Sequence, residues 1–139
     1  MNVNKKRTKI ILASLFLTFV ILRIYLHLFP GTNFDVGDYN IHHLFTGLLL
    51  ISLGGLPLAI FNGSSRYLDL AAITFGVGLS MALDEWVYLI ATDGSDASYL
   101  LPVSYLGGVI MVGFAIIYIV IMLMIARQCG CEGEDEKSL

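Results

Sequence analysis

Residues 102–126 read PVSYLGGVIMVGFAIIYIVIMLMIA and contain no Lys, Arg, Asp or Glu. A transmembrane helix needs about 20 mainly apolar residues, so this stretch is long enough to cross a bilayer. The rest of the chain has the same character. Of its 139 residues 57% are hydrophobic and 14% are charged, whereas soluble domains average about 25% charged residues. The sequence therefore predicts an integral membrane protein and argues against a soluble domain.

Three further apolar segments precede this stretch, at about residues 10–29, 41–61 and 68–92. The first follows a basic cluster, as a signal peptide would, but no small-residue cleavage site comes after it, which indicates an uncleaved helix. The connections are short and rich in turn-forming Gly, Asn, Asp and Ser. We predict one all-α domain over residues 1–139, a polytopic bundle of four transmembrane helices at about 10–29, 41–61, 68–92 and 102–126, with an acidic tail at 127–139.

The basic residues predict the orientation of the bundle. When four spans are drawn, seven basic residues fall on one side, and the connections on the other side carry acids only. Cytoplasmic loops carry the excess of Lys and Arg, so we expect both termini and the acidic tail to be cytoplasmic. The net charge of −3 offers no basic surface of the kind that neutralises phosphates, which argues against nucleic acid as a partner. The expected surroundings are the lipid bilayer.

Small residues recur at helical spacing and predict close contacts between helices. Gly47 and Gly54 lie seven apart, and Gly78 and Ala82 lie four apart. Residues three, four or seven apart share a helix face. His43 precedes Gly47 by four and Glu85 follows Ala82 by three, so polar side chains fall on the same faces. We expect these faces to point into the bundle, although membrane helices are rich in glycine in any case.

Asp84 and Glu85 lie inside the third apolar segment, where a charge costs roughly 2.5–3.5 kcal/mol on insertion scales. At 1.5 Å per residue they lie about 10–12 Å below the end of their helix, and Arg23 lies about 9 Å below the end of the first helix. The matching depths predict that Arg23 balances one of the two acids. His27 is expected to share the face of Arg23. The alternative is that Arg23 extends its long side chain to the headgroups.

Histidines and acids at the start of the second segment complete a candidate polar site. Asp38 is expected to cap that helix or to balance charge, and Tyr88, one turn from Asp84, to join the cluster. His nitrogens and carboxylate oxygens are ligands for Zn, Mn or Fe, so one hypothesis is a transition-metal site formed by His42, His43, Asp84 and Glu85. A second is metal-free acid/base chemistry with His43, Glu85 and Asp84 as the catalytic groups. A third is a purely structural network.

At these residues the chain resembles the VanZ-like family of small bacterial membrane proteins. The resemblance consists of Asp38-x-x-x-His42 at the opening of a membrane helix and of Gly76-x-Gly78 leading to Asp84-Glu85. It covers roughly residues 35–113. It implies a multi-pass protein of the bacterial inner membrane that is linked to the cell envelope and to glycopeptide susceptibility.

The leading functional hypothesis is an inner-membrane protein whose outward-facing His/acid site acts on, or recognises, a lipid-linked or envelope molecule. A second hypothesis is a non-enzymatic accessory or assembly protein whose buried charges hold the helices together. A third is a proton-coupled carrier, which would need to form a homo-oligomer to enclose a pathway. The sequence leaves open whether the protein is an enzyme. Cys129 and Cys131, beyond the fourth segment, are expected to be free thiols.

Overall fold

The structure is a computed structural model, which describes residues 4–29, 35–36, 39–40 and 42–135. Its elements are α1 (Lys5–Leu28), β1 (Asp35–Val36), β2 (Tyr39–Asn40), α2 (His43–Ile60), α3 (Arg66–Ala91), α4 (Asp96–Tyr99) and α5 (Pro102–Asp135). Four of the helices, over Lys5–Leu28, His43–Ile60, Arg66–Ala91 and Pro102–Gln128, are long and apolar enough to cross a membrane. The prediction of an all-helical protein with four candidate spans is confirmed. Strands β1 and β2 form only a two-residue antiparallel ladder.

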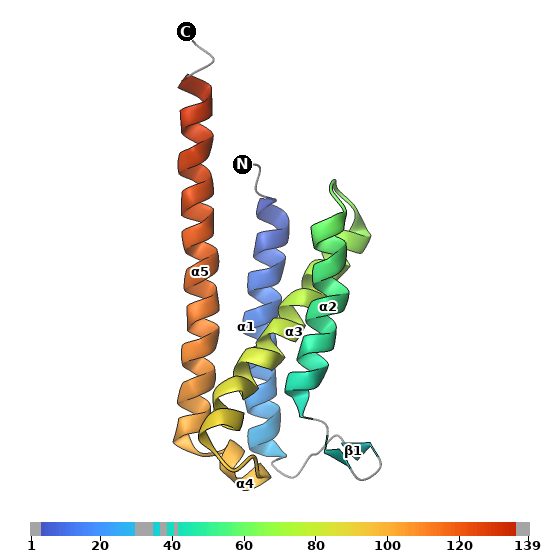
Figure 1. Ribbon diagram of the computed structural model, residues 1–139, viewed down its shortest axis with the longest axis vertical. Coiled ribbons are helices and arrows are strands. Elements are labelled where there is room, and N and C mark those ends of the chain that lie inside the picture. The colour runs from blue at the N-terminus through green and yellow to red at the C-terminus, as the bar shows by residue number, and fades with distance from the viewer. Residues whose placement is uncertain (1–3, 30–34, 37–38, 41, 136–139) are drawn as a thin grey trace.

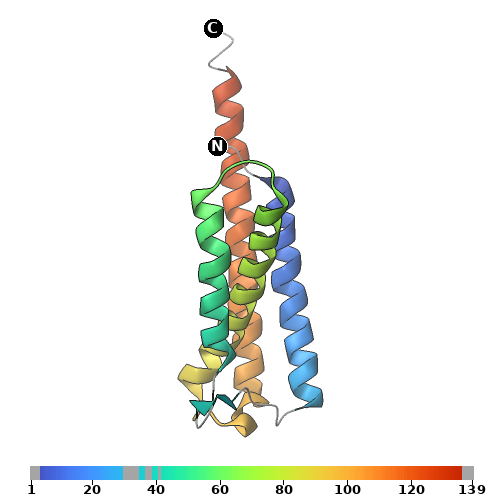
Figure 2. The same cartoon turned by 90° about the vertical axis from the view of Figure 1, so that its right-hand side faces the viewer.

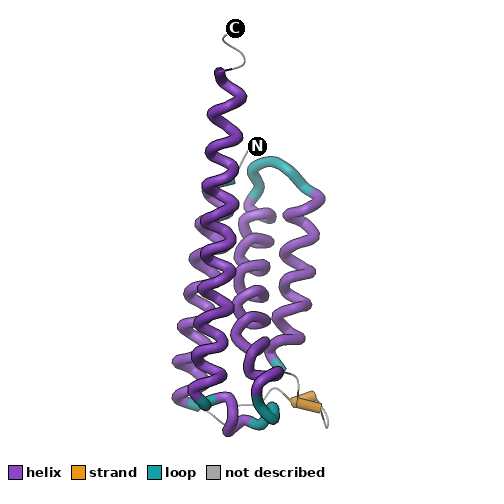
Figure 3. Tube along the Cα trace, turned by 60° about the vertical axis from the view of Figure 1, so that its left-hand side comes forward, coloured by secondary structure: helices purple, strands orange, loops and turns teal. Residues whose placement is uncertain are grey.

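The four long helices form one bundle in which α3 contacts α1, α2 and α5 (Figure 1). The start of α1, the end of α5 and the α2–α3 connection lie at one end of the bundle (Figures 1 and 2). The strands and α4 lie at the opposite end, which we call the α4 end. Described loops join α2 to α3 at one end and α3, α4 and α5 at the other (Figure 3). This up-and-down arrangement is the one that an even number of spans requires for termini on the same side.

The helices differ from the prediction in several places. Helix α1 begins at Lys5 rather than near residue 10, because the side chain of Asn4 accepts a hydrogen bond from the backbone N–H of Arg7 and caps the first turn. Helix α5 continues to Asp135, past the predicted end at Ala126 and into the acidic tail, because no proline stops its propagation. The four-residue helix α4 was not predicted from the sequence.

Glycines set the distance between α2 and α3. A Cβ atom built on Gly47 would lie 2.7 Å from the backbone oxygen of Gly78, and one built on Gly78 would lie 2.6 Å from the backbone oxygen of Gly47. A Cβ on Gly54 would lie 2.5 Å from the backbone oxygen of Ala71. These distances are too short for any side chain, so the two backbones touch directly. The predicted small-residue contacts between the helices are confirmed at these positions.

Candidate functional site

Helix α3 places two adjacent carboxylates inside the bundle near the α4 end. Asp84 is fully buried, and Glu85 is 2% exposed. Consecutive residues of a helix point about 100° apart, so the two side chains leave α3 in different directions. Asp84 contacts α1 and α4, whereas Glu85 contacts the start of α2. The pair of acids thus links three neighbouring elements to the central helix.

Arg23 of α1 forms an ion pair with Asp84. Its Nε donates to Oδ1 of Asp84 over 2.6 Å, and its Nη2 lies 2.6 Å from the same oxygen. The Nη2 atom also donates to the backbone oxygen of Ser104 over 3.0 Å, at the start of α5. The hydroxyl of Tyr99 in α4 donates to Oδ2 of Asp84. The structure therefore brings together Arg23 and Asp84, one of the two pairings that the matching depths predicted.

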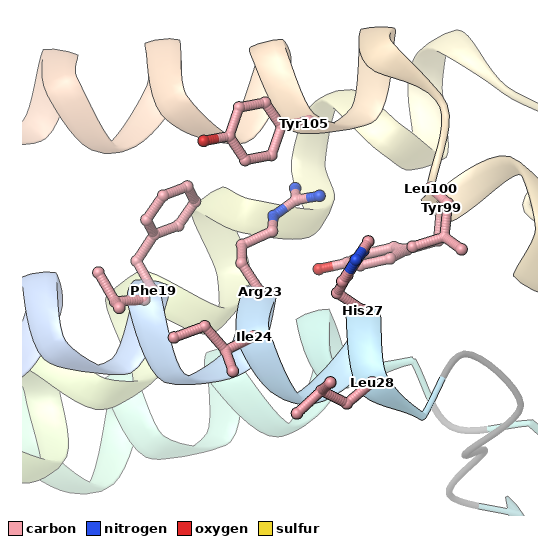
Figure 4. A pocket seen from close by; sticks show the side chains of 9 residues that line it. Phe19, Arg23, Ile24, His27, Leu28, Tyr99, Leu100 and Tyr105 are labelled. Carbon is pink, nitrogen blue, oxygen red and sulfur yellow. The ribbon is translucent and has the colours of Figure 1, made fainter.

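The guanidinium of Arg23 is surrounded by aromatic rings. Its Cζ lies 4.6 Å from the ring centroid of Tyr99, 5.6 Å from that of Tyr105 and 5.8 Å from that of Phe19. Cations are attracted to aromatic faces at such distances. With its side chain 11% exposed, Arg23 points inward between α1 and α5 (Figure 4). This position differs from the alternative of a side chain extended to the headgroups.

Glu85 holds the N-terminus of α2. Its Oε2 accepts a hydrogen bond of 2.5 Å from the backbone N–H of Leu44, and its Oε1 lies 3.0 Å from Nδ1 of His42. The first N–H groups of a helix have no partner within the helix, and a negative charge there is favoured by the helix dipole. Glu85 therefore caps α2 from another helix. Asp38, which we expected to take this role, lies outside the described residues.

His43 lies between the two carboxylates. Its Nε2 is 3.5 Å from Oδ2 of Asp84, and its Nδ1 is 3.5 Å from Oε1 of Glu85. Its ring meets that of Tyr99 edge-on, with centroids 5.7 Å apart. The Nε2 atom is buried and forms no hydrogen bond with any residue that the structure describes. The imidazole thus contacts both acids.

The histidines reach the acids because the start of α2 lies beside Glu85, whereas α3 continues past this level to Ala91. Helix α2 itself begins at His43, two residues later than predicted. From the sequence we expected both histidines near the membrane boundary, about 10 Å above the acids. We also expected only His43 to point inward. In the structure both His42 and His43 contact Glu85, since His42 precedes the first turn and its extended backbone lets both rings turn the same way.

Two other predicted site residues occupy different surroundings. His27 lies beside Tyr99 on the wall of a pocket between α1 and α5 (Figure 4), and within the described part of the chain it forms no ion pair with either acid. Its predicted role in balancing the acids is therefore not seen.

Tyr88 packs its ring against those of His42 and Tyr99, with centroids 6.1 and 5.2 Å apart. Its hydroxyl donates to the backbone oxygen of Ser95 over 3.1 Å.

Tyr99 is the member of the network that we did not assign to the site from the sequence. It lies in the connection between the third and fourth predicted segments. Burial raises the pKa of its hydroxyl, and the nearby charge of Asp84 raises it further, while the charge of Arg23 opposes this shift. The hydroxyl therefore remains a hydrogen-bond donor. Only the folding of α4 back onto α3 brings it to Asp84, so no spacing in the sequence could have revealed the contact.

The carboxylate oxygens are already engaged by protein groups. Asp84 accepts hydrogen bonds from Arg23 and Tyr99, and Glu85 interacts with His42 and the amide of Leu44. Among the described residues no group of three His, Cys, Asp or Glu side chains is arranged to hold a metal ion. A metal at His42, His43, Asp84 and Glu85 would have to compete with these partners. The contacts of Arg23, Tyr99, His42 and Leu44 with the two carboxylates form a hydrogen-bonded network.

Comparisons of the chain with protein-family models, with curated proteins and with solved structures find no match. The class is therefore defined by fold and site alone. The protein is a four-helix bundle with candidate membrane spans, and a charged network is buried at the end opposite its termini.

Proposed function

We propose that this chain is a multi-pass protein of the bacterial inner membrane, with both termini cytoplasmic, whose acid–base network recognises or acts on a lipid-linked or envelope molecule. Ionisable residues inside membrane segments are rare and usually mark functional sites. The positive-inside rule puts the α4 end on the outer side. The network would then be accessible from the outer leaflet, where such molecules are found.

The observation that carries this proposal is the position of His43. Its buried Nε2 has no hydrogen-bond partner within the described residues and lies 3.5 Å from a carboxylate oxygen of Asp84. Leaving a buried polar atom without a partner costs about 1–3 kcal/mol, so a bound hydroxyl or water that supplies the partner is favoured. The imidazole also lies 3.5 Å from a carboxylate oxygen of Glu85, and an imidazole beside carboxylates is a common arrangement for general acid–base chemistry.

One set of contacts favours the second hypothesis, a non-enzymatic protein with structural charges. Each carboxylate oxygen already has a protein partner, and Glu85 caps α2.

The transition-metal site at His42, His43, Asp84 and Glu85 stays a prediction. Elemental analysis of protein purified without chelator, repeated after metal addition, tests it directly. About one equivalent of Zn, Mn or Fe would establish the metal site.

The test of the proposal is cellular, and it follows the envelope link that the VanZ-like resemblance implies. The chain is expressed in a glycopeptide-susceptible bacterium, and the minimal inhibitory concentration of a glycopeptide is measured. We expect the wild-type chain to raise it and His43→Gln to abolish the effect at equal membrane abundance. Ser52→Ala is the matched control, because among the described residues the Ser52 hydroxyl bonds within its own helix, to the backbone oxygen of Leu48.

The three outcomes are distinct. Loss of the effect in His43→Gln but not in Ser52→Ala supports a site that uses the imidazole. Full activity in a folded His43→Gln variant would show that the network is structural. A wild-type chain that leaves the inhibitory concentration unchanged would overturn the proposed link to the envelope.

A further inference from the structure

A pocket of about 440 Å³ lies between α1 and α5 at the α4 end, on the α1 side of Arg23 (Figure 4). Its volume is in the range of about 300–1,000 Å³ that is typical of small-molecule sites. Arg23 and His27, one helical turn apart, supply polar groups, and Tyr99 and Tyr105 supply aromatic walls. None of the lining residues is acidic.

The polar side of this pocket offers hydrogen-bond donors. Arg23 uses Nε and Nη2 for Asp84 and for the backbone oxygen of Ser104, but no described residue accepts a hydrogen bond from its Nη1. A guanidinium carries donors on all three nitrogens, so the Nη1 edge can bind an oxyanion while the ion pair with Asp84 persists. The ring of His27 can donate a second hydrogen bond. Such a set of donors selects a ligand rich in acceptors.

The other walls of the pocket are apolar and continue onto the outer surface of the bundle. Ile24 is 56% exposed, Leu28 is 63% exposed and Leu100 is 48% exposed. In a membrane these side chains would contact lipid chains. Arg23 lies about 7.5 Å from the end of α1 at Leu28, at 1.5 Å per residue, so a headgroup at the end of the helix is about this far from the guanidinium. A ligand with a charged head and an apolar chain can therefore enter sideways from the bilayer.

We infer that this pocket binds an anionic phospholipid, with a phosphate oxygen on Nη1 of Arg23 and on His27 and an acyl chain along Ile24 and Leu28. The inference rests on the proposed membrane location but not on any chemistry of His43. Charge-assisted hydrogen bonds from arginine are the usual means of binding phosphate in proteins. A zwitterionic lipid fits less well, because its ammonium group would find no acid in the lining.

The first experiment compares three probes on the full chain in detergent. Dihexanoyl phosphatidylglycerol, dihexanoyl phosphatidylcholine and inorganic phosphate are each titrated, and the melting temperature is recorded. A ligand that binds only the folded state raises the melting temperature progressively with concentration. We expect a rise with phosphatidylglycerol, a smaller one with phosphatidylcholine and none with phosphate. Equal rises with both lipids would overturn the anionic selectivity, and an equal rise with phosphate would identify a simple anion site.

The second experiment locates the site with matched variants. Ile24→Trp fills the pocket, and Ile21→Trp adds the same side chain to the same helix at a position that is 62% exposed and outside the pocket. We expect Ile24→Trp to abolish the rise caused by phosphatidylglycerol and Ile21→Trp to retain it. His27→Ala should weaken binding by about tenfold or more, the factor that one charge-assisted hydrogen bond contributes.

Two controls keep the test decisive. Should Ile24→Trp fail to fold, Leu100→Trp fills the same pocket from the other side. Unchanged binding in both the pocket-filling variant and His27→Ala would overturn the assignment. His43→Gln should bind the lipid like the wild type, since its ring is not part of the lining. A failure of the proposed cellular function would therefore leave this result unaffected, and the reverse also holds.

Discussion

Asp84 and Glu85 are neighbours in the chain, but each belongs to a separate set of contacts. Asp84 binds the guanidinium of Arg23 and the hydroxyl of Tyr99, whereas Glu85 binds the first turn of α2. The energetic consequences of losing a partner should therefore differ between the two acids. Removing one member of a buried ion pair leaves a buried charge without compensation and typically costs about 3–5 kcal/mol.

Arg23→Ala should destabilise the protein because it strands the charge of Asp84. We expect a loss of up to about 3–5 kcal/mol, with a smaller value if the unfolded state in the membrane also finds partners. Adding Asp84→Asn should restore part of the loss, since the stranded charge is then removed. Adding Glu85→Gln should restore less, because Glu85 does not contact Arg23. Melting in detergent measures all three, and an unchanged melting temperature in Arg23→Ala would contradict the ion pair.

Tyr99 provides a pH prediction at the scale of one hydroxyl. Burial raises its pKa above the usual value of 10.0, so above about pH 10 the unfolded chain loses this proton while the folded chain keeps it. Ionisation of the tyrosine then favours the unfolded state, so the free energy of unfolding should fall as the pH rises past that value. In Tyr99→Phe this part of the alkaline destabilisation should be absent.

Phenolate absorbance measures the prediction for Tyr99. The folded wild type and folded Tyr99→Phe should give the same increase on alkaline titration, because Tyr99 does not ionise. The unfolded chains should differ by one tyrosine. A folded wild type that titrates one tyrosine more than the variant would show that Tyr99 is accessible to hydroxide.

At the scale of the elements, contact between α2 and α3 depends on glycine at particular positions. Gly54 and Gly55 are adjacent and make a matched pair. A Cβ atom on Gly54 would lie 2.5 Å from the backbone oxygen of Ala71, whereas one on Gly55 would lie 3.4 Å from the ring of Phe75. The first contact forces two backbones apart, and the second is one that a side chain can accommodate.

Gly54→Ala should therefore destabilise the bundle by about 1–3 kcal/mol, the usual cost of overpacking. Gly55→Ala should be neutral or stabilising by up to about 1 kcal/mol, because alanine is the better helix former. Thermal unfolding of the two variants in the same detergent checks the difference. Equal melting temperatures would show that the helices can separate at Gly54 without cost.

At the scale of the whole molecule, the main prediction is the orientation. A reporter enzyme that is active only outside the cytoplasm should be silent when fused after Leu139 and active when inserted near Ser95. The reason is the gathering of basic residues at the end of the bundle that carries the termini. An active fusion after Leu139 would reverse the orientation and place the network and the pocket at the cytoplasmic face.

The sequence by itself determined the number of long helices, their approximate ends and the small-residue contacts between α2 and α3. These features follow from local properties, because a segment that crosses a bilayer must be apolar over its length and must satisfy its backbone hydrogen bonds within itself. The depth of Arg23 and of the two acids follows from the same count of residues along each helix. Because the two depths match, the sequence also predicted that Arg23 would pair with one of the two acids.

Only the tertiary structure decided which acid pairs with Arg23, that Glu85 caps α2 through the amide of Leu44, and that Tyr99 joins Asp84. Those contacts depend on how each helix is rotated about its axis and on the path of the connections. Residue spacing within one helix carries no information about the rotation of its neighbours. The pocket between α1 and α5 is likewise a product of packing, since its walls come from segments more than seventy residues apart in the chain.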